Sequence, residues 1–146
     1  MRAIVLATVA LSLIAADAPK NDAKKEITQL EGEWSMVSGI ADGQPMPEQM
    51  VKTMRRVAKD GMTTVTTDDQ IFMKAKFTID PAKKPKTIDY QMTDGPTKGK
   101  TQLGIYQIEG DTVKFCFAKP DQARPTDFTS KPGSGWTSSV WKREKK

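Results

Sequence analysis

Apolar and polar residues alternate in four short runs in the second half of the chain, at residues 71–79, 87–93, 101–108 and 112–118. Each run ends at or near a cluster of Gly, Pro or Asp residues. Period-two alternation bounded by such clusters is typical of half-buried β-strands joined by turns. The pattern therefore predicts consecutive antiparallel strands, the last two of them joined by a tight Gly-Asp hairpin turn.

Four further segments complete the set of predicted strands, at residues 33–40, 62–67, 127–129 and 136–143. In the first of these, Trp34, Met36 and Ile40 are predicted to share one face, with Ser38 among them. Asp42-Gly43 and Asp68-Asp69 are turn signals after the first two segments. Gly104 lies inside the predicted strand at 101–108, where a glycine often marks a bend or a bulge.

One internal helix is predicted between the first two strands, at residues 47–59. Pro47 suits the first helical position, and Gly61 would cap the end. Met50, Met54 and Val57 recur at helical spacing and form an apolar stripe. A stripe of this kind is more often part of the core than a lid over a ligand.

About eight strands and one short helix in one domain indicate an all-β fold. Strands of this length, mostly joined by tight turns, form either an antiparallel sandwich or an up-and-down β-barrel. We favour the barrel of about eight strands, because closure removes the exposed strand edges that a meander would leave.

Residues 1–18 have the pattern of a secretory signal peptide. Arg2 is followed by an unbroken run of small and apolar residues, and Ala16-Asp17-Ala18 fits a small-x-small cleavage site. The run is shorter than the roughly 20 residues that a spanning helix needs, which argues against the alternative of an uncleaved membrane anchor. We therefore expect an exported, periplasmic or extracellular protein that is not an integral membrane protein after cleavage. A lead-in segment or short helix at 19–31 would precede the barrel domain at 32–146.

The formal net charge is +5, and lysines fall in small clusters. The clusters are Lys83, Lys84 and Lys86; Lys98 and Lys100; and Lys142, Arg143, Lys145 and Lys146. A basic surface attracts anionic polymers or head groups, although it also simply keeps a protein soluble. An anionic envelope polymer or a protein is thus one predicted partner. Nucleic acid is not, because few aromatic residues accompany the lysines.

The chain has no histidine and one cysteine, Cys116. These counts exclude an internal disulfide, Ser-His and Cys-His nucleophile pairs, and histidine-containing zinc sites. Alternation places Cys116 on the face opposite Phe115 and Phe117, and no basic partner is apparent that would activate its thiol. No cofactor is predicted. The turns at Asp68-Asp69 and Asp94 offer too few oxygen ligands for calcium, so no metal site is predicted either.

The predicted barrel interior is the candidate ligand site. An eight-stranded barrel is either filled by side chains or holds one small ligand, and methionine and phenylalanine suit both outcomes. We predict a non-catalytic binding module for a small apolar or amphipathic ligand, with a packed core as the alternative. The inward-facing set is Met36, Met73, Phe77, Tyr90, Met92, Ile105, Phe115 and Phe117.

The proline-fixed loop at 124–127 is a second candidate. Arg124 beside Asp127 would either gate the barrel mouth or form an ion pair that holds the loop.

An enzyme is the least favoured function. Such an enzyme would pair carboxylates in the manner of a glycosidase, but acidic residues in turns usually bond local backbone. The carboxylates in question are Asp80, Asp89, Asp94 and Asp127.

Three blocks, DPAKKPKTIDY, TDGPTKGKTQLGIYQIEGDTVKFCFA and ARPTDFTSKPGSG, together with the opening LEGEW, resemble a family of small exported proteins. This family is abundant in planctomycete bacteria and is described as lipocalin-like. The Asp42-Gly43 turn followed by Pro45 and a helix is similar as well, so the resemblance spans nearly the whole mature chain. It implies a lipocalin-like β-barrel and no particular activity.

Gly32-Glu33-Trp34 also resembles the G-x-W motif of lipocalins proper. In that superfamily an arginine of the last strand packs over the tryptophan, and Arg143 is the matching residue here. The resemblance implies a structural clamp of Trp34 and Arg143 at the base of the barrel. It does not extend to the C-terminal helix of lipocalins, which has no counterpart after residue 143.

Overall fold

The computed structural model describes residues 18–145. The predicted signal peptide therefore lies outside the described residues, except for Ala18, which begins the first helix. That helix, α1, covers Ala18–Leu30, where the lead-in segment was expected. A second, short helix and nine strands follow. They are β1 Gly32–Ala41, β2 Gln44–Pro45, α2 Glu48–Thr53, β3 Met54–Lys59, β4 Met62–Thr67, β5 Gln70–Asp80, β6 Lys86–Asp94, β7 Thr101–Glu109, β8 Thr112–Phe117 and β9 Thr137–Arg143.

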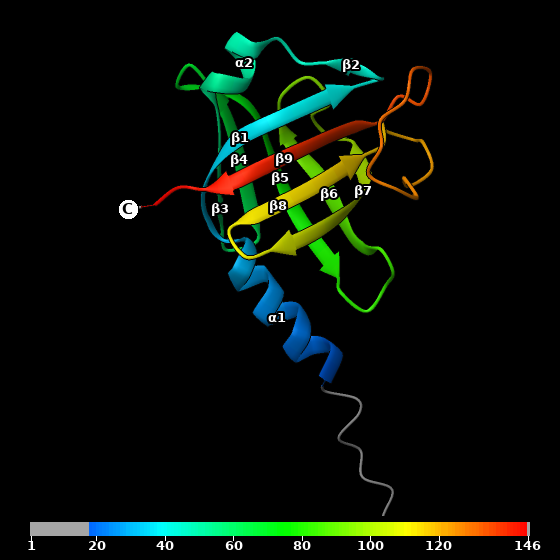
Figure 1. Ribbon diagram of the computed structural model, residues 1–146. Coiled ribbons are helices and arrows are strands. Elements are labelled where there is room, and N and C mark those ends of the chain that lie inside the picture. Colours follow the sequence, from blue (N-terminus) through cyan, green and yellow to red (C-terminus); the bar gives the residue numbers. More distant parts are fainter. Residues whose placement is uncertain (1–17, 146) are drawn as a thin grey trace, which may run out of the picture.

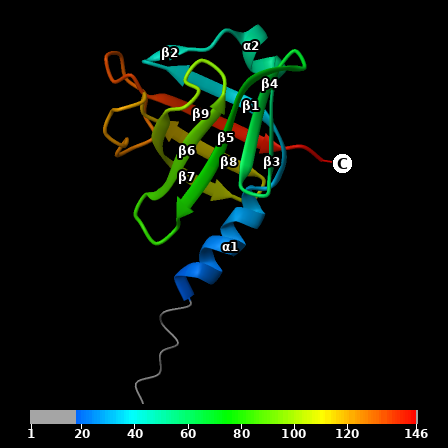
Figure 2. The same cartoon turned by 180° about the vertical axis from the view of Figure 1, so that it is seen from behind.

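Eight of the strands form a closed antiparallel barrel, which confirms the predicted fold class. The order is β1-β3-β4-β5-β6-β7-β8-β9, and β9 pairs back with β1 (Figure 1). The two-residue strand β2 adds to the outer edge of β1 where the turn at Asp42 reverses the chain. Figure 2 shows the opposite wall, built from β4 to β7. Closure leaves no long unpaired strand edge, as expected from the cost of exposed edges.

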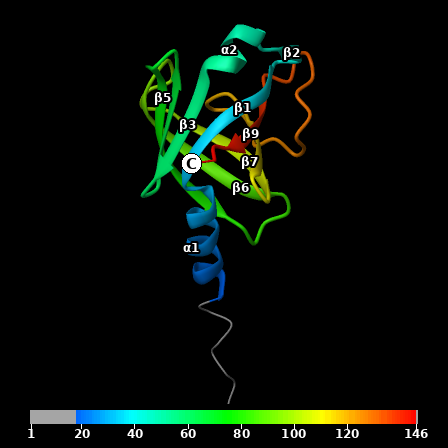
Figure 3. The ribbon, with the colours of Figure 1, turned by 60° about the vertical axis from the view of Figure 1, so that its left-hand side comes forward.

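The two helices lie at opposite ends of the barrel (Figure 3). The last turn of α1 closes one end, where Ile27 and Leu30 pack against the core. Glu26 of α1 accepts a hydrogen bond from the Tyr106 hydroxyl and forms an ion pair with Lys86. Burial, and then this hydrogen bond, raise the pKa of Tyr106. We call this end the base of the barrel, and the end beside α2 the mouth.

The predicted helix at 47–59 is wrong beyond Thr53. The structure instead has the strand β3, whose Met54, Arg56 and Ala58 point inward and are buried. Asp60 and Gly61 have φ of 52° and 75°, so they form a two-residue hairpin turn into β4 and not a helix cap. The stripe that suggested a helix is divided: Met50 belongs to α2, whereas Val57 faces outward on β3.

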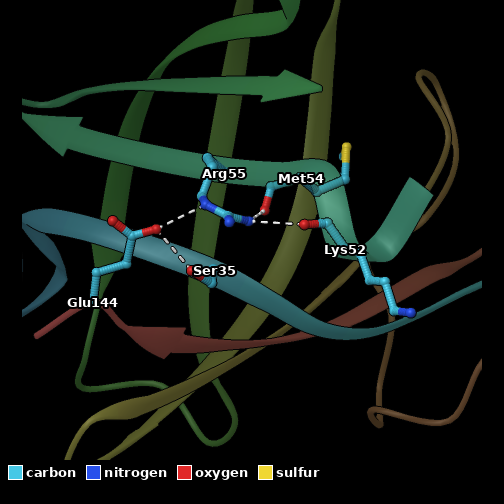
Figure 4. A network of polar contacts seen from close by, with 5 residues as sticks. All are labelled: Ser35, Lys52, Met54, Arg55 and Glu144. Carbon is cyan, nitrogen blue, oxygen red and sulfur yellow. Dashed lines mark hydrogen bonds and ion pairs between the residues drawn. The ribbon is translucent and has the colours of Figure 1, made fainter. Parts of the chain in front are cut away.

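A polar network on the outside of the barrel fixes the start of β3 (Figure 4). The Arg55 guanidinium donates to the carbonyl oxygens of Lys52 and Met54, both at 3.1 Å. It also pairs with Glu144, whose carboxylate accepts from Ser35 of β1 at 2.7 Å. Because Arg55 is held outside, strand alternation turns the next residue, Arg56, into the barrel.

Two other predictions about strands differ from the structure. A bulge at Val37 shifts the register between Met36 and Ser38. The even-numbered residues point inward before the bulge and the odd-numbered residues after it, so Ile40 does not share the face of Trp34 and Met36. The predicted strand at 127–129 is irregular and belongs to a long loop, residues 118–136. Arg124 of this loop binds Asp89 of β6 and the Gly104 carbonyl of β7 on the outside of the barrel, so the loop is held without a sheet partner.

Candidate functional site

A cavity of about 580 Å³ occupies the mouth half of the barrel. Residues of every barrel strand line it, together with the segment from Gln44 to Met50 and the loop residues Pro96 and Thr97. Its volume falls in the range of about 300 to 1,000 Å³ that is typical of small-molecule sites. The sequence left open whether the interior is filled, and the structure shows a filled base and a hollow mouth.

The cavity wall is rich in methionine. Six of the eight methionines of the chain line it, on β1, α2, β3, β5, β6 and the segment before α2. Methionine has a flexible, polarisable side chain that adapts to ligands of different shapes. The six are Met36, Met46, Met50, Met54, Met73 and Met92.

Phe72 lies at the rim of the cavity. A bulge in β5 places it between the residues that pair with β4, and it is 38% exposed. Its neighbour Ile71 is 50% exposed, although simple alternation over the predicted strand at 71–79 would place it on the same inner face as Met73. The mouth is therefore bordered by apolar surface as well as lined by it.

The floor of the cavity carries a charged residue, Arg56, whose side chain is only 3% exposed. Its guanidinium carbon lies 4.1 Å from the centroid of the Phe115 ring and 5.6 Å from that of Tyr90. Arg56 thus reaches from β3 across the barrel interior to β8 and β6. Cation–π contact compensates in part for the loss of water around its charge. The sequence prediction missed Arg56, because it placed this residue on a helix.

Tyr90 stands beside Arg56 in the cavity wall, and its hydroxyl is buried without a hydrogen bond of normal geometry. Burial raises the pKa of Tyr90, while the charge of Arg56 and close contacts of the hydroxyl with Arg56 and Thr63 oppose that shift. The phenol is therefore protonated at neutral pH.

Several other polar groups of the cavity wall already have partners. The Gln102 amide donates to the Ala118 carbonyl at 2.9 Å, and its oxygen accepts from Thr97. The Ser139 hydroxyl accepts from the Trp141 indole at 2.8 Å. Gln44 and Thr137 also line the cavity, so the polar side chains that remain for a ligand are these two and those at the floor.

The predicted interior residues divide into three groups. Phe77 and Phe115 are buried in the filled base, below the cavity. Ile105 is buried but lies on the outer face of β7, because its partner in β6 is Thr87, while the inward Ile88 pairs with Gly104. The five predicted residues that line the cavity are Met36, Met73, Tyr90, Met92 and Phe117.

Trp34 and Arg143 meet at the base, as their resemblance to the lipocalin pair implies. The Arg143 guanidinium carbon lies 4.2 Å from the Trp34 ring, and the two residues pair across β1 and β9. Arg143 also donates to the carbonyl oxygens of Gln29 and Glu31, at 2.6 and 2.8 Å. The contact joins α1, the first strand and the last strand.

Arg124 and Asp127 do not form the expected pair, and neither residue lines the cavity. Arg124 instead binds Asp89 of β6 at 2.6 Å and the carbonyl of Gly104 at 2.8 Å. Asp127 accepts from the backbone amide of Thr129 at 2.8 Å. Arg124 thus fastens the long loop to the outer wall, away from the mouth.

Cys116 faces outward under the same loop and is completely buried. Burial, with a smaller effect of Asp127, raises the pKa of its thiol to about 11. Its side chain is a small packing element between β8 and the loop.

The acidic residues considered for catalysis are engaged locally. Asp80 accepts from the amide of Ala82 at 3.0 Å, and Asp94 accepts from that of Gly95 at 2.8 Å. Within residues 18–145, no three His, Cys, Asp or Glu side chains gather in a group that would hold a metal ion. That the protein is not an enzyme stays a prediction.

The lysine clusters are spread over both ends of the barrel. Lys83 and Lys84 follow β5 near the base, whereas Lys98 and Lys100 follow β6 near the mouth (Figure 2). Lys142 lies on β9, which closes the barrel against β1. The clusters do not combine into one face. Neither helix in the described range has the length and apolar character needed to cross a membrane.

In comparisons with protein-family models, curated proteins and solved structures, the chain matched none at a significant level. The resemblance to small exported planctomycete proteins therefore stays a prediction. The fold and the cavity define the class: a closed eight-stranded antiparallel β-barrel with an internal, methionine-lined cavity.

Proposed function

We propose that this protein is a binding module that holds a small apolar or amphipathic ligand in the mouth half of its barrel. The observation that carries the proposal is the cavity of about 580 Å³, whose wall is mainly apolar and contains six methionines. Transfer of apolar ligand surface from water into such a site supplies roughly 25 cal/mol per Å². A barrel of this size with a fully packed interior would offer no such site.

The segment from Gln44 to Thr53 supports a route of entry. It crosses the mouth as β2 and α2, and Met46 and Met50 from this segment line the cavity. None of the α2 residues is fully buried, so the segment rests on the barrel without being part of its core. A ligand would enter beside it, across the apolar rim that contains Phe72.

Uptake of the neutral dye Nile red tests the proposal. We expect saturable fluorescence enhancement with the purified protein. Ala41 lies on β1 at the mouth, lines the cavity and is small. Ala41→Phe should fill part of the cavity and weaken dye binding at least about ten-fold, the equivalent of 1.4 kcal/mol.

Val37→Phe is the matched control, because Val37 lies on the same strand but is 55% exposed on the outside. This variant should bind the dye as the unaltered protein does. Equal dye affinity in all three proteins, or no saturable binding by the unaltered protein, would contradict an internal site.

We further propose that the protein acts after export, in the periplasm or outside the cell, as the signal-peptide pattern at residues 1–18 indicates. The alternative function, contact with an anionic envelope polymer through the basic surface, stays a prediction. The distribution of lysines over both ends of the barrel does not favour it over the cavity.

A further inference from the structure

Three buried side-chain polar atoms in the described part of the chain lack a hydrogen-bond partner, and they belong to neighbouring residues inside the barrel. They are an Nη atom of Arg56 and the hydroxyl oxygens of Thr63 and Tyr90. Most buried polar groups in proteins are paired, so a cluster of unpaired groups calls for a physical explanation. A ligand group that binds there provides one.

Arg56 carries the strongest requirement. Its guanidinium keeps its charge at any ordinary pH. Residues 18–145 supply it with no carboxylate, since the ion pairs of the structure involve Arg55, Arg124, Arg143 and two lysines. An isolated buried charge is costly, and aromatic faces offset only part of that cost. The charge is therefore expected to have a partner of opposite sign from outside the chain.

The geometry of the floor defines what that partner is. Arg56 lines the cavity and carries N–H donors in a fixed plane, and the neutral Tyr90 phenol stands next to it in the cavity wall. A carboxylate has two oxygen atoms that accept several hydrogen bonds and matches the guanidinium plane. An alcohol provides a single oxygen without charge, and an ammonium group would be repelled by Arg56.

We infer that the ligand is an apolar carboxylic acid, whose carboxylate binds Arg56 and Tyr90 at the floor while its apolar body fills the methionine-lined part of the cavity. This inference rests on the proposed function, because it assigns the head group of the same ligand. The inference goes further than the proposed function, because an uncharged apolar ligand would satisfy that function and leave Arg56 unpaired.

Competition between decanoate and decanol for the Nile red site tests the inference at neutral pH. The two probes have the same chain and differ in the head group. In Arg56→Met the ratio of decanoate affinity to decanol affinity should fall about ten-fold to a hundred-fold, since a hydrogen bond to a charged group contributes about 1.5 to 3 kcal/mol. Nile red and decanol should still bind this variant.

Arg55→Met is the matched control. Arg55 is the preceding residue, but it lies outside the barrel and pairs with Glu144. The affinity ratio should be the same in this variant as in the unaltered protein. Tyr90→Phe removes one hydroxyl and should lower the ratio less than Arg56→Met does.

The outcomes separate the two claims. If Arg56→Met leaves the ratio unchanged while Nile red still binds, the carboxylate inference is wrong and the binding-module proposal stands. If neither Nile red nor decanol binds the unaltered protein, both are wrong. Should Arg56→Met fail to fold, an unchanged ratio in Tyr90→Phe overturns the inference by itself.

Discussion

Trp34→Ala is expected to lower the free energy of unfolding by about 3 to 5 kcal/mol, the usual cost of removing a large buried aromatic side chain. Trp34 is fully buried at the base of the barrel. Its indole donates to the Leu30 carbonyl at 3.0 Å, and its ring supports the guanidinium of Arg143. The substitution therefore removes core volume, the bond that holds the end of α1, and the contact between the first and last strands.

Chemical denaturation measures this loss. Trp34→Phe is the matched variant, because it keeps an aromatic ring in the core and removes the indole donor. It should cost clearly less than Trp34→Ala. A loss below about 1 kcal/mol for Trp34→Ala, the level of an ordinary surface substitution, would contradict the role of this residue in closing the barrel.

Gly104→Ala is expected to destabilise the protein by about 2 to 3 kcal/mol, within the range for overpacking a core. A Cβ atom at this position would lie 2.6 Å from Cε1 of Phe117 and 2.9 Å from the carbonyl oxygen of Cys116. The Phe117 ring is packed against Tyr90, with centroids 4.2 Å apart, and cannot retreat freely. The added methyl group must therefore displace Phe117, the β8 backbone, or both.

Denaturation of the single variants and a double variant tests the mechanism. In a Phe117→Leu background, Gly104→Ala should cost at least about 1 kcal/mol less, because neighbours in contact are not additive. An equal cost in both backgrounds would show that the backbone contact with Cys116 dominates. Since Phe117 lines the cavity, Gly104→Ala should also weaken Nile red binding.

The strands β5 and β6 were predictable because each has one clear apolar face and ends at a turn signal. Strand β6 is the plainest case, with Ile88, Tyr90 and Met92 all buried on one face. The strand β3 was not predictable in the same way. Its Met54 and Val57, preceded by Met50, match a helical stripe, and no glycine or proline interrupts the segment before Gly61.

The predicted number of barrel strands agrees with the structure only because two errors offset each other. The prediction omitted β3 and included a strand at 127–129 that the structure does not have. Two runs of equal length, MRRVAK and MTTVTT, flank Asp60-Gly61. Because Asp-Gly is a strong hairpin signal, this pattern predicts the strand β3.

The floor of the cavity was hidden for a related physical reason. Charged residues are almost never fully buried, so nothing local to Arg56 distinguishes it from the exposed Arg55. Whether each arginine points into or out of the barrel follows from the alternation of side chains along a strand. A predicted helix has no such alternation. The prediction that Ile105 points inward was wrong for another reason. The loop at 118–136 covers the outer face of β7, so apolar residues lie on both faces of this strand.

The measurement that most directly tests whether the cavity holds a ligand is quenching of tryptophan fluorescence by a brominated alkanol. Trp141 lines the cavity, whereas Trp34 lies below it and Trp136 lies in the outer loop. We expect saturable quenching at one equivalent of ligand, and loss of most of it in Trp141→Phe. Quenching that rises linearly without saturation, or that saturates equally in Trp141→Phe, would show that the ligand does not occupy the barrel.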